Sequence, residues 1–283
     1  LVFNCNSTTK MPLDRQPDFV LGQPDLVTTT PNTQNAANSC TSTVNACGLK
    51  EPRGLAIANN TLLVADYLNN RVLLFNLSDG ITNGEAAVNV LGQADFTAST
   101  APNPPTATSM CQPIGVAVRT DVKCLVSTPP AGTCLFVSEY CNHRIVTFNA
   151  PFSNGQAADY VIGQTGTTAA AGCTNDGNSF NDACQLTLQN GVKFPRGVAY
   201  LSNKLYLADS GNNRVLRFDV TMVSSALNAD GLVGQTTNWT TGTAGTSAGT
   251  LRDHRGVSVN SAGTKLFVSE GTATVTQGRT TVF

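Results

Sequence analysis

The 283-residue sequence has little charge and no long apolar run. Charged residues make up 12% of it, about half the share usual in globular domains, and 17 basic residues nearly balance 18 acidic ones. Since no basic block is present to neutralise phosphates, we expect no nucleic-acid partner. No apolar segment approaches the roughly 20 residues that a membrane-spanning helix needs, so we expect no membrane insertion.

Residues and motifs that carry enzymatic chemistry are also scarce. The only histidines, His143 and His254, lie far apart in the sequence, and no H-E-x-x-H, G-x-S-x-G or Walker-type run is present. Aromatic residues make up 6%, with one tryptophan, which argues against a stacking platform for sugars or bases. We therefore predict a protein that is not an enzyme and holds no metal or cofactor.

Hydrophobic residues, at 41%, are enough for a sizeable core, and they follow an internal repeat. A short apolar run that ends in Gly-Gln occurs four times, with glycines 70, 71 and 71 residues apart. The copies are Val20–Gln23, Val90–Gln93, Val161–Gln164 and Leu232–Gln235.

Three further blocks follow each Gly-Gln. The first has the form Pro-x-Gly-[Leu/Val], the second ends in an acidic residue, and the third begins with arginine and ends in phenylalanine. The first block begins at Pro52, Pro113, Pro195 and His254. The acidic residues are Asp66, Glu139, Asp209 and Glu270, and the arginines are Arg71, Arg144, Arg214 and Arg279.

Each unit thus offers four short β-rich runs and no helical periodicity. Repeated four-stranded units are typical of a β-propeller. We predict an all-β fold, one propeller domain over 1–283 with four repeats of about 70 residues and long polar loops stapled by disulfides. The units are 5–75, 76–148, 149–218 and 219–283, with 1–4 as a strand that completes a blade. The loops are 24–51, 94–112, 165–194 and 236–253.

The motif P-x-G-[LV]-A followed by [VL]-[AS]-[DE]-x-x-N-x-R-[VI]-x-x-F resembles the NHL repeat, a propeller family. The resemblance covers about 25 residues in each unit and weakens at 254–283, where the proline and the asparagine before arginine are missing. It implies four-stranded blades whose inner strands open at Gly54, Gly115, Gly197 and Gly256. It implies little about function, because the family includes lyases, RNA readers and protein-binding modules. The zinc of the lyases is bound by a set of histidines that His143 and His254 do not reproduce.

The recurring charged residues allow two interpretations. A ring of catalytic carboxylates is one, but a residue present in every blade is better explained by carboxylates that fix a turn through arginine or backbone hydrogen bonds. Arg53, Arg196 and Arg255, which precede the inner-strand glycines, could form an anion-binding mouth. Pairing with nearby carboxylates is favoured.

Nine cysteines indicate an oxidising compartment. Spacings of 7, 10 and 11 residues do not match zinc-ligand patterns, and Cys111 and Cys141 both lie at one end of the second unit. The expected disulfides are Cys40–Cys47, Cys111–Cys141, Cys124–Cys134 and Cys173–Cys184. Cys5 is left over, as a free thiol or an intermolecular partner.

Four N-x-[ST] triplets support secretion, because N-glycans are added to surface turns of secreted proteins. The candidate glycosylation sites are Asn6, Asn59, Asn76 and Asn238.

The two ends of the chain carry the same strand of the repeat. Leu1–Asn4 and Thr281–Phe283 both match the end of the arginine block, so one is surplus if four blades close within one chain. A boundary artefact, a piece of a longer array and a strand donated to a neighbouring molecule all explain this surplus.

These observations lead to a first hypothesis, a secreted, glycosylated structural propeller that polymerises head to tail with copies of itself by exchanging terminal strands. The alternative is an extracellular propeller that binds a protein or glycan through loops 24–51 and 165–194. An NHL-type lyase is the third reading and the least favoured.

Overall fold

The computed structural model describes residues 1–125, 131–164, 191–225, 227–235, 239, 244–245, 247, 249–271 and 279–283. The described part of the chain is built from short strands and three-residue 3-10 helices, and no helix in it is long and apolar enough to span a membrane. The 3-10 helices are η1 (Ala36–Asn38), η2 (Tyr67–Asn69) and η4 (Ser210–Asn212).

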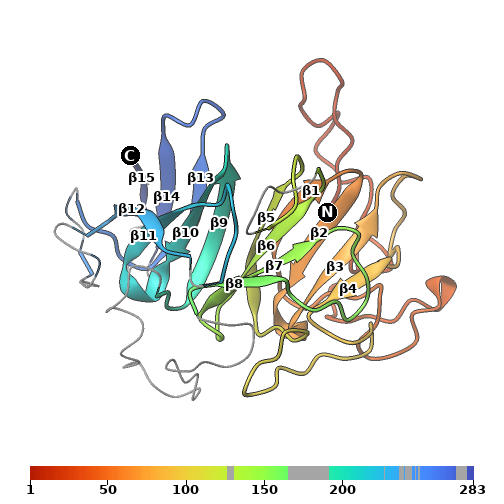
Figure 1. Ribbon diagram of the computed structural model, residues 1–283. Coiled ribbons are helices and arrows are strands. Elements are labelled where there is room, and N and C mark those ends of the chain that lie inside the picture. The colour runs from red at the N-terminus through yellow and green to blue at the C-terminus, as the bar shows by residue number, and fades with distance from the viewer. Residues whose placement is uncertain are drawn as a thin grey trace.

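The strands form four antiparallel sheets, which are the blades of a propeller (Figure 1). Blade 1 contains β1 (Pro52–Ala58), β2 (Thr61–Asp66), β3 (Arg71–Asn76) and β4 (Asn89–Leu91). Blade 2 contains β5 (Pro113–Arg119), β6 (Cys134–Glu139), β7 (Arg144–Asn149) and β8 (Tyr160–Ile162). Blade 3 contains β9 (Pro195–Leu201), β10 (Lys204–Asp209), β11 (Arg214–Asp219) and β12 (Ala229–Val233). Blade 4 contains three described strands, β13 (His254–Val259), β14 (Leu266–Glu270) and β15 (Arg279–Val282).

Each structural blade runs from the Pro-x-Gly block to the next Gly-Gln. The four runs of the repeat are therefore four adjacent strands in sequence order, from the inner strand to the outer one. The all-β, propeller-like fold predicted from the repeat is confirmed, and the polar segments between Gly-Gln and Pro-x-Gly are the connections between blades.

Asparagines make the tight turns within the blades. Asn59 and Asn60, between β1 and β2, have φ of 47° and 59°, as a two-residue hairpin turn requires. Asn70 and Asn213, just before β3 and β11, have φ of 55° and 52°, and His143 takes the same conformation in blade 2. The asparagine of the repeat thus occupies a turn position with a left-handed backbone conformation, which asparagine tolerates better than most residues.

The core lies between the blades. One buried cluster joins blades 1 and 2 through residues such as Leu74 and Leu135, and a second joins blades 2 and 3 through residues such as Phe136 and Leu207. A smaller cluster lies between blades 3 and 4 around Val215 and Leu266. Packing between neighbouring blades therefore supplies most of the buried apolar surface.

The candidate functional site

The recurring carboxylates and arginines form buried ion pairs. Asp66 and Arg71 are 2.8 Å apart, Glu139 and Arg144 3.2 Å, and Asp209 and Arg214 2.6 Å, and all six side chains are fully buried. The fourth pair, Glu270 and Arg279, joins atoms 2.5 Å apart but is partly exposed.

Each pair fastens the connection that leads into its own blade. The Asp66 carboxylate accepts hydrogen bonds from the Lys50 backbone and the Asn69 side chain, and Arg71 donates to the backbone carbonyls of Asn45 and Gly48. Burial raises the pKa of Asp66, and the charge of Arg71 acts against this rise. Arg71 also donates to the Phe96 carbonyl of the next connection. The buried pair thus binds the backbone of both connections, which supports the structural interpretation of these residues.

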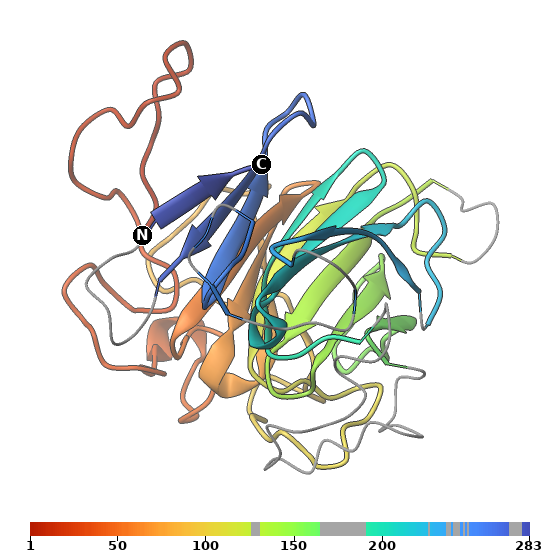
Figure 2. The ribbon, with the colours of Figure 1, turned by 90° about the vertical axis from the view of Figure 1, so that its left-hand side faces the viewer.

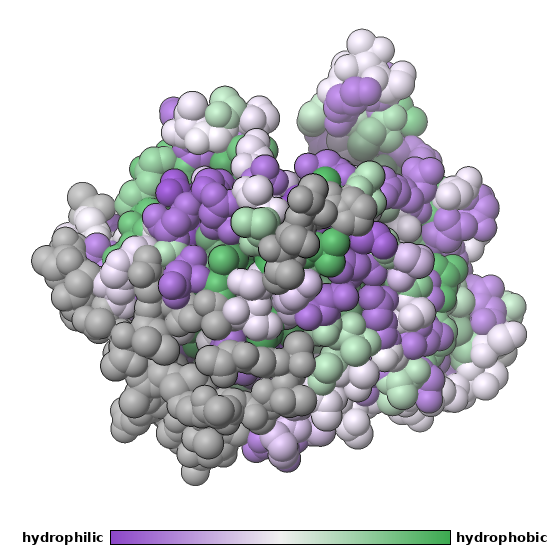
Figure 3. Space-filling model, in the orientation of Figure 1, coloured by the Kyte–Doolittle hydropathy of each residue, from purple (hydrophilic) through white to green (hydrophobic). Residues whose placement is uncertain are grey.

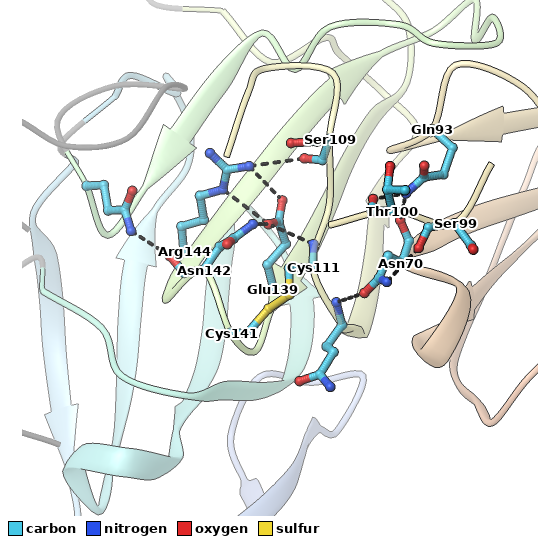
Figure 4. The surroundings of a disulfide bond; sticks show 12 residues. Asn70, Gln93, Ser99, Thr100, Ser109, Cys111, Glu139, Cys141, Asn142 and Arg144 are labelled. Atoms are coloured by element: carbon cyan, nitrogen blue, oxygen red, sulfur yellow. Dashed lines mark hydrogen bonds and ion pairs between the residues drawn. A yellow bond between two sulfur atoms is a disulfide. The ribbon is translucent and has the colours of Figure 1, made fainter. Parts of the chain in front are cut away.

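Blade 2 repeats this arrangement beside a disulfide (Figure 4). Arg144 donates to the Ser109 carbonyl and to Glu139, and Asn142 also donates to Glu139. The Cys111–Cys141 disulfide joins the end of the same connection, just before β5, to the turn after β6. The ion pair and the disulfide thus hold one loop at two points.

The arginines before the inner-strand glycines pair with carboxylates. Arg53 lies 3.1 Å from Glu51, and Arg196 and Arg255 lie 3.7 Å and 3.2 Å from Asp253. The Arg53 guanidinium also stacks 3.8 Å above the Tyr67 ring. These contacts match the favoured interpretation of paired arginines.

The two histidines serve separate blades. His143 accepts a hydrogen bond from the Phe194 backbone at Nδ1, whereas His254 is buried with Nε2 2.7 Å from the Arg214 carbonyl oxygen. Burial lowers the pKa of His254 to about 4. No group of three or more His, Cys, Asp or Glu suited to a metal ion occurs among the described residues.

Three disulfides are present, Cys40–Cys47, Cys111–Cys141 and Cys124–Cys134, which are three of the four expected pairs. Cys5 is free and exposed. Cys173, Cys184 and the sequon at Asn238 lie outside the described residues, as does most of the loop 165–194.

The three described sequons lie at exposed or half-buried positions at strand ends or in turns. The amide oxygen of Asn6 accepts hydrogen bonds from the Thr8 and Thr9 backbone. The amide nitrogens of Asn59 and Asn76 donate to Thr133 and Asp79.

Of the two loops that the alternative hypothesis names, 24–51 is described in full and 165–194 only at 191–194. Thr30–Gln34 and Thr43 line a shallow polar hollow of about 470 Å³. The rest of the loop is held by Arg71 and the Cys40–Cys47 disulfide.

The four blades form an open arc. The inner strands β1, β5, β9 and β13 pack side by side in this order, and the two ends of the chain lie on opposite sides of Figure 1. The glycine of each inner strand abuts a carbonyl oxygen of the next blade, so that no Cβ would fit. The pairs are Gly54 with Ile114, Gly115 with Arg196 and Gly197 with Arg255. A Cβ on Gly256 would meet only Ser269 of its own blade among the described residues, whereas a closed ring of four would pack it against blade 1.

The opening leaves apolar residues exposed on one face of blade 1 and on one face of blade 4. Figure 2 views the molecule from the side of blade 4. On β1, Leu55 and Ile57 are 65% and 62% exposed. On blade 4, Phe267 is half-buried and Val282 is 51% exposed. At the boundaries inside the arc, the corresponding faces cover each other. Phe136, for example, has the repeat position of Phe267 and is fully buried against blade 3. We call these two surfaces the open faces.

Residues 1–22, here called the N-terminal half-blade, lie in front of blade 1 and carry the repeat segments that form the third and fourth strands in the other blades. Val2 pairs with Phe19 in an antiparallel bridge. The Val20 backbone N–H donates to the Asn83 side chain of blade 1, as the Val90 N–H of β4 donates to Asn154 of blade 2. The half-blade therefore packs against blade 1 in the same way as the outer strand β4 packs against blade 2.

Solved structures with a similar fold share little sequence with the chain. Hydrazine synthase from Kuenenia stuttgartiensis is 12% identical, with a TM-score of 0.48, over 83% of this chain and 46% of that one. A 6-phosphogluconolactonase candidate from Bacteroides uniformis is 17% identical, with a TM-score of 0.42, over 81% and 51%. The chain spans about half the length of both. No curated protein matches the chain in sequence.

A family model, the NHL repeat, matches residues 193–218, which run from the start of blade 3 through β11. In this segment the Pro-x-Gly, acidic and arginine blocks follow one another at the same spacing as in blade 1. With the blades that the structure shows, the chain is a β-propeller that carries an NHL repeat in its third blade.

Proposed function

We propose that the protein is a non-enzymatic, extracellular structural propeller that assembles head to tail with copies of itself. The observation that carries the proposal is the match between its two open faces. Blade 4 of one copy would cover Leu55 and Ile57 of the next copy, as blades cover each other inside the arc. Such a contact joins two different surfaces and continues into a fibre unless the rotation between copies closes a ring.

The N-terminal half-blade supports the same assembly. It holds the outer two strands of a blade, and blade 4 has no described strand beyond β15. In the proposed contact the half-blade of one copy joins β13 and β14 of its neighbour, with Leu1–Asn4 in the place of β15. This composite blade would exchange a terminal strand between molecules.

Secretion and N-glycosylation are part of the proposal. The three disulfides support an oxidising compartment. Asn6 is exposed, and its contacts engage the amide oxygen, so its nitrogen is the best placed of the described sequons for a glycan. A mass decrease of the native protein after glycosidase treatment would support this part, and an unchanged mass would refute it.

The test of assembly replaces the exposed residues of β1. Wild-type protein at micromolar concentration should sediment as oligomers and form fibres or rings in electron micrographs. The Leu55→Asp/Ile57→Asp variant should sediment as a monomer with nearly unchanged stability, because both side chains are exposed in the single chain.

Leu26→Asp/Val27→Asp is the matched control, since those residues are also exposed but belong to loop 24–51 and not to β1 or blade 4. It should assemble like the wild type. A wild type that stays monomeric overturns the proposal and leaves the alternative, an extracellular module that binds a protein or glycan through loops 24–51 and 165–194.

A further inference from the structure

We propose that a cavity beside β12 receives the tip of the N-terminal half-blade of a second copy, with Met11 as the residue that fills it. The inference rests on the proposed head-to-tail assembly and specifies where a second contact forms. It follows from a docking pattern that is found at each of the remaining blade boundaries.

In each complete blade, the connection between the third and fourth strands docks on the outer strand of the preceding blade. The Val20 and Val90 N–H groups donate to Asn83 and Asn154, at 2.9 Å in both cases, and the Val161 N–H donates to Ser225 at 3.3 Å. The three valines whose N–H groups donate these hydrogen bonds are 5%, 0% and 0% exposed.

An apolar residue of the same connection enters the boundary between the blades. It lies eleven residues before the Gly-Gln glycine of its blade and two before the capping side chain. In blades 1 to 3 the residues at this position are Ile81, Phe152 and Val223. Phe152 packs into the core between blades 1 and 2, and Val223 is fully buried between blades 2 and 3.

The outer strand of blade 3 has no such cover among the described residues. Leu232, the counterpart of Val90 and Val161, is half-buried, and no contact like that of Asn154 is found at its backbone in the described part of the chain. A cavity of about 220 Å³ opens there.

The cavity is lined at the same repeat positions as the cluster that holds Phe152 two blade boundaries away. Its lining residues Tyr206, Val215, Arg217, Val233, Leu266 and Phe283 hold the repeat positions of Leu63, Val72, Leu74, Leu91, Leu135 and Phe148. Between blades 1 and 2 these positions belong to the buried cluster against which Phe152 packs. Between blades 3 and 4 no described residue packs at the position of Phe152, and the cavity lies there.

Met11 has the sequence position of the missing residue. It lies eleven residues before Gly22 of the N-terminal half-blade, as Phe152 lies eleven before Gly163. Met11 and Leu13 are 64% and 66% exposed, on a segment that projects from the molecule and carries apolar as well as polar groups (Figure 3). In the composite blade Leu1–Asn4 replaces β15, so Phe3 takes the repeat position of the wall residue Phe283. The segment of Met11 then reaches blade 3 of the neighbouring copy, and an unbranched methionine suits a cavity shaped for another side chain.

Crosslinking tests the contact directly. In a Cys5→Ser background, Met11→Cys with Leu232→Cys should give a ladder of covalent oligomers on oxidation, which reducing agent dissolves. The matched control, Met11→Cys with Met222→Cys, places the second thiol on a more exposed residue of blade 3 that does not line the cavity, and should give no ladder.

Charge at the same position supplies an independent readout. Met11→Glu should raise the midpoint concentration of assembly roughly tenfold or more, because the glutamate would lose its hydration in a largely apolar cavity whose arginine, Arg217, is already paired with Asp230. Met222→Glu should leave the midpoint unchanged. A wild type that assembles, with no ladder and no effect of Met11→Glu, overturns the docking and leaves the proposed function standing. A wild type that does not assemble overturns both.

Discussion

Blades 2 and 4 share one repeat but differ in what covers them. In blade 2, Phe136 and the Glu139–Arg144 pair are fully buried between neighbouring blades. In blade 4, the counterpart Phe267 is half-buried, and the side chain of Arg279 is 39% exposed beside Glu270. The strands and the ion pair form in both blades, so the repeat is enough to specify them. How deeply the side chains are buried depends on the neighbouring blades.

The same difference appears in the carboxylates. Burial would raise the pKa of Glu270, but hydrogen bonds from Arg279 and the Arg252 backbone outweigh it, and the pKa lies below the usual value. In blade 3, where the pair is fully buried, the pKa of Asp209 is raised. One motif therefore has two electrostatic environments, according to whether a further blade shields it from water.

Truncating the two phenylalanines gives the largest expected contrast. Phe136→Ala should destabilise the protein by about 3–5 kcal/mol, since it leaves a cavity in a closed core. Phe267→Ala should cost only about 1 kcal/mol in the monomeric Leu55→Asp/Ile57→Asp background, because its side chain already contacts water. Urea unfolding measures both, and equal losses would show that the face of blade 4 is not open.

Removing one partner of each ion pair should give the next contrast. Arg144→Met leaves Glu139 buried and unpaired, at a cost of about 3–5 kcal/mol. Arg279→Met leaves a carboxylate that water can reach, and should cost at most about 1 kcal/mol. Unfolding at neutral pH compares the two, and the comparison fails if Arg279→Met is as damaging as Arg144→Met.

The smallest contrast concerns pH. Because the pKa of His254 is lowered to about 4 in the folded chain, only the unfolded chain takes up this proton as the pH falls below about 6.5. The contribution of His254 to stability is thus complete above that pH, and roughly 3 kcal/mol is lost as the pH falls to about 4.

Pro113 occupies the position of His254 in blade 2. His254→Pro should therefore remove this part of the pH dependence while keeping the strand. Unfolding at neutral pH and at about pH 4 would test it, and an unchanged slope in the variant would refute the assignment to His254.

Much of the fold was predictable from the sequence because the repeat is local. Gly-Gln, Pro-x-Gly and the acidic and arginine blocks each mark one strand, and Asn70 and Asn213 mark left-handed turns. The disulfides that the structure shows follow the expected spacings. The cavity beside Leu232 was not predictable from any single motif, since its walls come from two blades.

The sequence by itself determined what each blade is, because hydrogen bonds between consecutive strands and the turns that join them depend on residues close together in the chain. It left open whether four blades close a ring. Only the tertiary structure decided this, since the curvature of the arc depends on how Gly54, Gly115 and Gly197 seat against the next blade. With no such partner at Gly256, the faces of blades 1 and 4 stay apart, and this separation makes the apolar residues on them available to another molecule.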